Sequence, residues 1–195
     1  MLVALKTTPN PLAKHQEKVY VVDDHVGLVF SGLTADARYL CKYMRTETMN
    51  YWYSMNSQHP VERLVTKIQT KAQGKTCHGA KRPYGVGMLV GGIDEAGTHL
   101  YETCPSANFY EYKAMAIGAK CQSAKTYLER NFDSFDNVSR DELIKHGVKA
   151  LKASAQEEEL TVDNVSVGVL SADEPFHLLD EAELGRFLGG GMQDA

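Results

Sequence analysis

The sequence contains few cysteines, and none of them are closely spaced. Its four cysteines are Cys41, Cys77, Cys104 and Cys121, a scatter that favours a reducing compartment over a disulfide framework. No stretch approaches the roughly 20 apolar residues that a bilayer-spanning helix needs, so we expect no membrane contact. The opening residues have no long apolar segment after a basic start, and we expect no signal peptide. These absences predict a protein of the cytoplasm, the nucleus or both.

The charge pattern also lacks a dominant sign. The net charge is −4, the sequence pI is near 6.0, and acidic and basic residues are interspersed. A nucleic-acid-binding protein usually carries a basic face that attracts the phosphate backbone, so we expect no nucleic acid partner. A length of 195 residues suits a single domain with a sizeable core.

The first half of the chain predicts three strands and then two helices. Short β-branched and aromatic runs favour strands over residues 2–5, 19–22 and 26–30, the last two as a hairpin. Thr34 is the expected N-cap of the first helix, and Pro60 stands where the second begins. Apolar residues at helical spacing define their buried stripes, namely Ala37, Leu40, Cys41 and Met44, then Val61, Leu64, Val65 and Ile68.

The second half predicts the same sequence of elements again. Residues 84–91 alternate in the manner of a strand, and turns at 94–97 and 105–108 separate it from two further strands. Ser139 and Glu142 form a capping box at the start of the second of two helices, and two short strands and a last helix follow. Two helix pairs with one apolar stripe each need two sheet faces. The expected fold class is therefore α+β, with two antiparallel sheets between helices.

Three other patterns can be interpreted as either structural or functional. The glycines between Gly85 and Gly92 lie inside a strand pattern, so close backbone approach is favoured over a nucleotide loop. Cys77 and His78 lack the paired close spacing of structural zinc ligands, and we predict no metal and no cofactor. The aromatic residues Tyr39, Tyr43, Tyr51, Trp52 and Tyr53 fit either a subunit contact or the core.

Several short motifs resemble a known family. Residues 31–38 (SGLTADAR), 82–87 (RPYGVG) and 111–118 (EYKAMAIG) are similar to segments of alpha-type subunits of the eukaryotic 20S proteasome. Residues 17–19 and 23–25 match as well, so the resemblance extends from near Met1 to about Leu188. Residues 103–108 and 122–130 are most similar to the type-1 alpha subunits.

The resemblance implies a fold and a function. It implies the four-layer αββα sandwich of N-terminal nucleophile hydrolases, and a non-catalytic place in a seven-membered outer ring that guards entry to a proteolytic chamber. The implied partners are other alpha subunits, beta subunits and the C-terminal tails of activators, in ubiquitin-dependent protein degradation. The family's N-terminal tail and first helix have no counterpart in the sequence. We therefore expect residues 1–195 to be one N-terminally truncated proteasome-subunit domain.

The resemblance also implies a site for activator tails. Lys18 matches the lysine that receives the tail's carboxylate, and Gly32 and Leu33 match the turn that shapes the same pocket. Considered without the resemblance, Lys18 is better interpreted as a solvated lysine at a strand edge, and Gly32 is equally consistent with a need for backbone freedom alone. No catalytic residue is expected, because catalytic subunits need an N-terminal threonine and an aspartate where Lys6 stands. The alternatives are a catalytic hydrolase of the same fold and a stand-alone binding domain.

Overall fold

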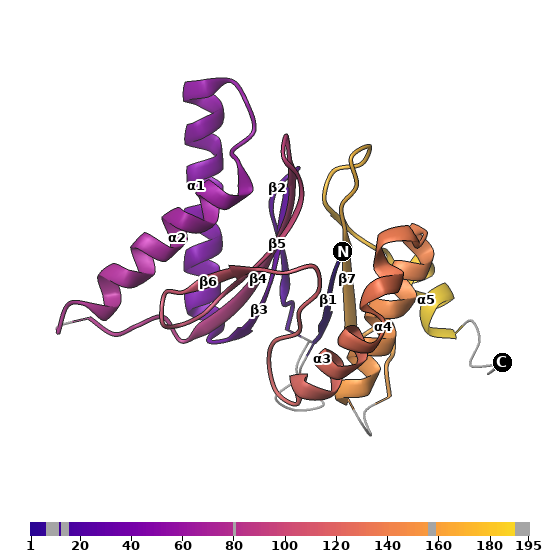
Figure 1. Cartoon of the computed structure of the whole chain (residues 1–195). Coiled ribbons are helices and arrows are strands. Elements are labelled where there is room, and N and C mark those ends of the chain that lie inside the picture. Colours follow the sequence, from indigo (N-terminus) through magenta and orange to yellow (C-terminus); the bar gives the residue numbers. More distant parts are fainter. Residues whose placement is uncertain (7–11, 13–15, 80, 156–158, 190–195) are drawn as a thin grey trace.

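The computed structural model describes residues 1–6, 12, 16–79, 81–155 and 159–189. Its described strands form two antiparallel sheets that lie face to face (Figure 1). The larger sheet has five strands in the order β2-β3-β4-β5-β6, and the smaller has three in the order β1-β7-β8. The strands are β1 (Leu2–Leu5), β2 (Val19–Asp23), β3 (Val26–Gly32), β4 (Val86–Asp94), β5 (Gly97–Thr103), β6 (Phe109–Glu111), β7 (Val165–Val169) and β8 (His177–Leu178).

Helices cover the outer face of each sheet. On the five-stranded sheet lie α1 (Thr34–Met55) and α2 (Val61–Thr76), and beside the three-stranded sheet lie α3 (Cys121–Arg130), α4 (Arg140–Ala155) and α5 (Glu181–Gly189) (Figure 1). A 3₁₀ helix over Phe132–Asn137 joins α3 to α4. The predicted αββα sandwich is therefore confirmed.

Each interface between layers has its own apolar core. Leu28 and Met44 belong to the core under α1 and α2, and Leu2 and Leu89 belong to the core between the two sheets. Ile144 and Val167 belong to the core between the small sheet and α4. Both predicted apolar stripes in the first half of the chain are buried. The spacing of apolar residues therefore predicted correctly which faces of α1 and α2 pack on the sheet.

The first helix begins one residue earlier than predicted. Its N-cap is Leu33 rather than Thr34, and no side chain caps the free amides there. The Thr34 hydroxyl instead accepts a hydrogen bond from the Gln16 amide at 2.7 Å, which ties the helix to the segment before β2. At the other end the helix continues to Met55, so Tyr51, Trp52 and Tyr53 lie within it.

Glycines in β4 let a helix approach the sheet closely. A Cβ added at Gly92 would lie 2.6 Å from Cγ2 of Val61, the first residue of α2.

The predicted capping box is also present at the start of α4. The Glu142 carboxylate accepts a hydrogen bond from the Ser139 amide at 3.0 Å, and the Glu142 amide donates to the Ser139 hydroxyl at 3.4 Å. Across the described part of the chain, no helix has the length and apolarity to cross a membrane.

Candidate functional site

Three segments far apart in the sequence meet at the end of β3. Gly32 pairs with Val86 across the β3–β4 ladder, which places residues 31–38 beside residues 82–87. The Leu33 amide donates to the Gly85 carbonyl at 2.8 Å. From a third segment, Gly118 approaches so closely that an added Cβ would lie 3.1 Å from the Ser31 hydroxyl. The three motifs of the sequence analysis therefore surround one turn.

Gly32 is the residue that this turn requires. Its φ is +124°, a backbone conformation that residues other than glycine rarely adopt. An added Cβ would lie 2.3 Å from the Gly85 carbonyl oxygen, inside van der Waals contact. Backbone freedom and lack of volume are both needed here, so glycine is the residue that fits.

A buried carboxylate holds the neighbouring strand in place. Asp36 in the first turn of α1 accepts two hydrogen bonds from the Arg82 guanidinium, at 2.7 and 2.8 Å, and one from the Gly85 amide at 2.9 Å. The Arg82 hydrogen bonds hold the pKa of Asp36 below its ordinary value, although burial opposes them. The paired charge thus fixes Gly85 against the turn at Gly32.

Lys18 directly precedes β2, the edge strand next to β3. Its carbonyl accepts from the Phe30 amide at 3.2 Å, which sets it opposite a residue two positions before Gly32. Strand alternation puts Lys18 on the same face as Tyr20, whose ring stacks on that of Phe30. The side chain is half-buried, and β2 is the edge of its sheet. The role of Lys18 in binding a tail remains a prediction.

Leu33 completes the group and is the exposed member of it. It is 53% accessible, a high value for a leucine, while its side chain covers the position where a Cβ on Gly85 would stand. Lys18, Gly32 and Leu33 lie at the same end of the larger sheet, where β2 begins and β3 ends. We call these three residues the rim site. An ammonium beside an apolar surface is suited to a chain-terminal carboxylate.

The rest of the described chain shows no competing catalytic centre. Lys6, which stands where a catalytic strand would need an aspartate, pairs with Glu17 at 3.3 Å. Thr7 and Thr8 lie outside the described residues. Burial raises the pKa of Cys41, which makes its thiol a poor nucleophile. Within the described ranges no three His, Cys, Asp or Glu residues gather in a metal-binding group.

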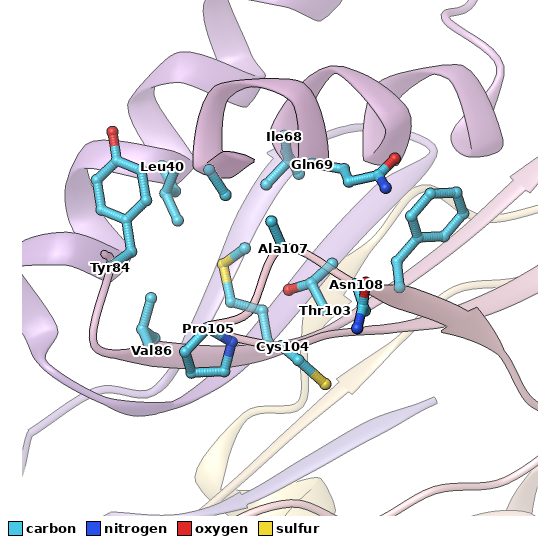
Figure 2. A pocket seen from close by; sticks show the side chains of 13 residues that line it. Leu40, Ile68, Gln69, Tyr84, Val86, Thr103, Cys104, Pro105, Ala107 and Asn108 are labelled. Atoms are coloured by element: carbon cyan, nitrogen blue, oxygen red, sulfur yellow. The ribbon is translucent and has the colours of Figure 1, made fainter. Parts of the chain in front are cut away.

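One cavity lies under α1 and α2, with about 320 Å³ of empty space that includes its open mouth (Figure 2). Its walls are mostly apolar, and Leu40, Ile68 and Tyr84 are among them. The Cys104 sulfur points away from Leu40 and Ile68 (Figure 2), and burial raises the pKa of its thiol. We assign the cavity to imperfect packing between layers, not to chemistry.

Comparison with known proteins identifies the family. A family model described as proteasome subunit matches residues 1–170. Among similar curated proteins are three named proteasome subunit alpha type-1. The Dictyostelium discoideum protein is 50% identical over 96% of this chain and 77% of its own length, the Drosophila melanogaster protein 42% over 94% and 67%, and the Trypanosoma brucei rhodesiense protein 40% over 97% and 72%.

The chain therefore belongs to the proteasome subunit family. Within it, the chain is an alpha-type subunit, similar to the type-1 members and shorter than them. The resemblance noted from short motifs is confirmed at the level of the whole chain.

Proposed function

We propose that this chain is a non-catalytic subunit of the alpha ring of the 20S proteasome. In this role it builds the outer seven-membered ring, guards substrate entry and receives activators, in the cytoplasm and nucleus, during ubiquitin-dependent protein degradation. Its partners are other alpha subunits, beta subunits and activator tails. The core between the two sheets supports a single domain, because the inner faces of both sheets contribute residues to the same apolar cluster.

The rim site is the observation that carries the activator role. Burying a tail carboxylate between subunits is costly unless a cation meets it. Lys18 supplies a cation, and the turn at Gly32 is held by three segments, so little ordering is needed when a tail arrives. The exposed Leu33 offers an apolar contact to the tail's side chains.

The far end of α1 supports assembly with neighbours. This half of the helix projects beyond the sheets (Figure 1), and Trp52 and Tyr53 are 55% and 91% exposed there. Met49 and Met55 are exposed on the same segment. Aromatic and methionine side chains are enriched at interface centres, so we assign this end of α1 to a contact with another proteasome subunit.

Absence of peptidase activity is the first test of the proposal. We expect the purified chain to leave fluorogenic peptides intact, because the proteins to which it is similar are alpha-type subunits, which are generally non-catalytic. The matched control is an active proteasome core particle under the same conditions. Hydrolysis by the purified chain that a threonine-directed inhibitor abolishes would establish the alternative, a catalytic hydrolase of the same fold.

The second test addresses the rim site directly. Within an assembled particle, Lys18→Ala should weaken tail affinity at this pocket about tenfold or more, and so lower tail occupancy there, because a charge-assisted contact contributes about 1.5–3 kcal/mol. Lys42→Ala, on the exposed face of α1, is the control and should leave occupancy unchanged. Occupancy is measured in structures of activator-bound particles, with the other pockets as internal references. Equal occupancy in wild type and Lys18→Ala would remove Lys18 from the proposal.

A further inference from the structure

Residues 16–18 lead into β2 and end at Lys18. The Lys18 carbonyl accepts a hydrogen bond from the Phe30 amide, which continues the pairing of β2 with β3 by one residue. In an extended chain, successive side chains point to opposite faces. The contacts of Gln16 and Glu17 follow this rule, because Gln16 reaches α1 on one face of the larger sheet and Glu17 reaches the smaller sheet on the other.

The first anchor joins Gln16 to the start of α1. The Gln16 side-chain amide donates to the Thr34 hydroxyl at 2.7 Å, and the contact is partly buried. Thr34 directly follows Leu33, so this hydrogen bond connects the residue two positions before Lys18 to the residue next to the exposed leucine of the rim site. It therefore ties the Lys18 side of the rim site to the Leu33 side.

The second anchor joins Glu17 to the smaller sheet. One carboxylate oxygen of Glu17 lies 3.3 Å from the Lys6 ammonium, and the other accepts a hydrogen bond from the Ser166 hydroxyl at 3.2 Å. Lys6 directly follows β1, and Ser166 is a buried residue of β7. Lys6 also neutralises the charge of Glu17, which would otherwise weaken the attraction of Lys18 for an anion.

We propose that Gln16 and Glu17 are positioning residues, which fix the place at which the Lys18 ammonium meets a tail carboxylate. This inference rests on the proposed function, because it concerns how the rim site receives a tail. Lys18 directly follows both anchored residues, and its own carbonyl is bound to β3. Its backbone is therefore held by contacts from α1, from β3 and from the smaller sheet.

Such positioning matters because a charge-assisted hydrogen bond depends on distance and direction. Ordering a backbone residue costs conformational entropy. Since the protein's own contacts already order residues 16–18, a tail that binds does not bear this cost. Loss of either anchor should therefore weaken tail binding although the Lys18 charge is unchanged. Long-range attraction between Lys18 and a tail would not depend on the anchors.

The test uses substitutions that remove a hydroxyl from each anchor and change no charge. In assembled particles, Thr34→Val and Ser166→Ala should each weaken tail affinity about two- to tenfold, whereas Thr34→Ser keeps the hydroxyl and should bind as wild type does. The probe is a short peptide that copies an activator's C-terminal tail and carries a photo-crosslinker, and crosslinking to this chain is followed against peptide concentration. Thr70→Val, at an exposed position of α2, is the control and should leave affinity unchanged.

An amidated form of the same peptide shows whether the loss passes through Lys18. Wild type should prefer the free carboxylate, and Thr34→Val should reduce this preference, a change that a merely structural role would not produce. In a chain that already carries Lys18→Ala, Thr34→Val should have no further effect on affinity, because the group that it positions is gone.

Three results would contradict the inference, and they can be told apart. Unchanged affinity in both Thr34→Val and Ser166→Ala, together with a loss in Lys18→Ala, would refute the positioning role and leave the rim site in place. Equal losses from Thr34→Val with and without Lys18 would show that the anchor acts on something other than the ammonium. Unchanged affinity in Lys18→Ala would refute the activator role of the rim site, and the positioning role with it.

Discussion

Replacing Gly32 by alanine should destabilise the fold at the rim site more than replacing Gly97, a glycine in another turn, by alanine. The added Cβ would meet two separate obstacles. One is conformational, since φ at this position is +124°. The other is steric, because the methyl carbon would lie 2.3 Å from the Gly85 carbonyl oxygen and 3.0 Å from the Val86 Cα. Both of these are backbone atoms, so no side chain can rotate away to make room.

The size of the effect can be divided between these two causes. A side chain held in a backbone region that favours glycine costs about 1–3 kcal/mol. The collision can be relieved only by moving β4 from β3, which strains the hydrogen bond from Leu33 to Gly85. A lost buried hydrogen bond adds about 1 kcal/mol. We expect a total loss of about 2–4 kcal/mol in the free energy of unfolding.

Gly97 provides a matched control. Its φ is +123°, yet no atom lies within 4 Å of the position its Cβ would take. Gly97→Ala therefore carries the conformational cost without the collision. Urea unfolding of both variants, followed by far-UV circular dichroism, should place the Gly32→Ala midpoint below that of Gly97→Ala. Equal midpoints would show that β3 and β4 adjust freely at this turn, and that the close approach does not fix the rim site.

Two further predictions concern pH. Burial lowers the pKa of His99, but hydrogen bonds to Glu111 and Asp94 outweigh it and raise the value. Protonated His99 should therefore stabilise the fold below pH about 6.5, and this effect should be lost as pH rises through its folded pKa. The difference in unfolding free energy between His99→Asn and wild type should shrink as pH rises through that folded pKa, and a difference that stays constant with pH would contradict this. Asp36 has a lowered pKa, so Asp36→Asn should cost about 1–3 kcal/mol at neutral pH and progressively less as pH falls through the folded pKa of Asp36 in wild type. Chemical denaturation across the acid range tests this, and a cost that persists at the lowest pH would mean that geometry rather than charge carries the pairing.

Much of the fold could be predicted, because the spacing of apolar residues along the chain indicates which faces of the helices and strands are buried. The order of strands and helices follows from it, and the hairpin register then sets Lys18 opposite Phe30 and close to Gly32. The end of α1 could not be predicted in this way. Its buried stripe stops at Thr48, and the end of the helix projects beyond the sheets (Figure 1), so most of the remaining positions are exposed.

The partners of single charged residues were also beyond prediction. Asp36 and Arg82 are 46 residues apart, and from sequence alone a first-turn aspartate indicates only a favourable interaction with the helix dipole. The pairing depends on the loop after α2 returning to the start of α1. The contacts of the Lys71 ammonium with the Tyr39 and Tyr43 rings have the same origin, because the way α1 and α2 cross determines which of their exposed faces meet.

The rim site is best understood as a frame made by three segments with one charged side chain beside it. Leu33 is fixed by the Gly85 carbonyl, Gly85 by the Asp36 carboxylate, and Ser31 by the close approach of Gly118. Each of these contacts joins residues that are 49 or more positions apart in sequence. The turn therefore depends on the whole larger sheet being folded. A ligand that binds a frame of this kind meets a surface already in its bound shape, and its affinity is not reduced by ordering the backbone. The specificity of the rim site should therefore reside in its two side chains, the charge of Lys18 and the apolar surface of Leu33, while Gly32 sets their position.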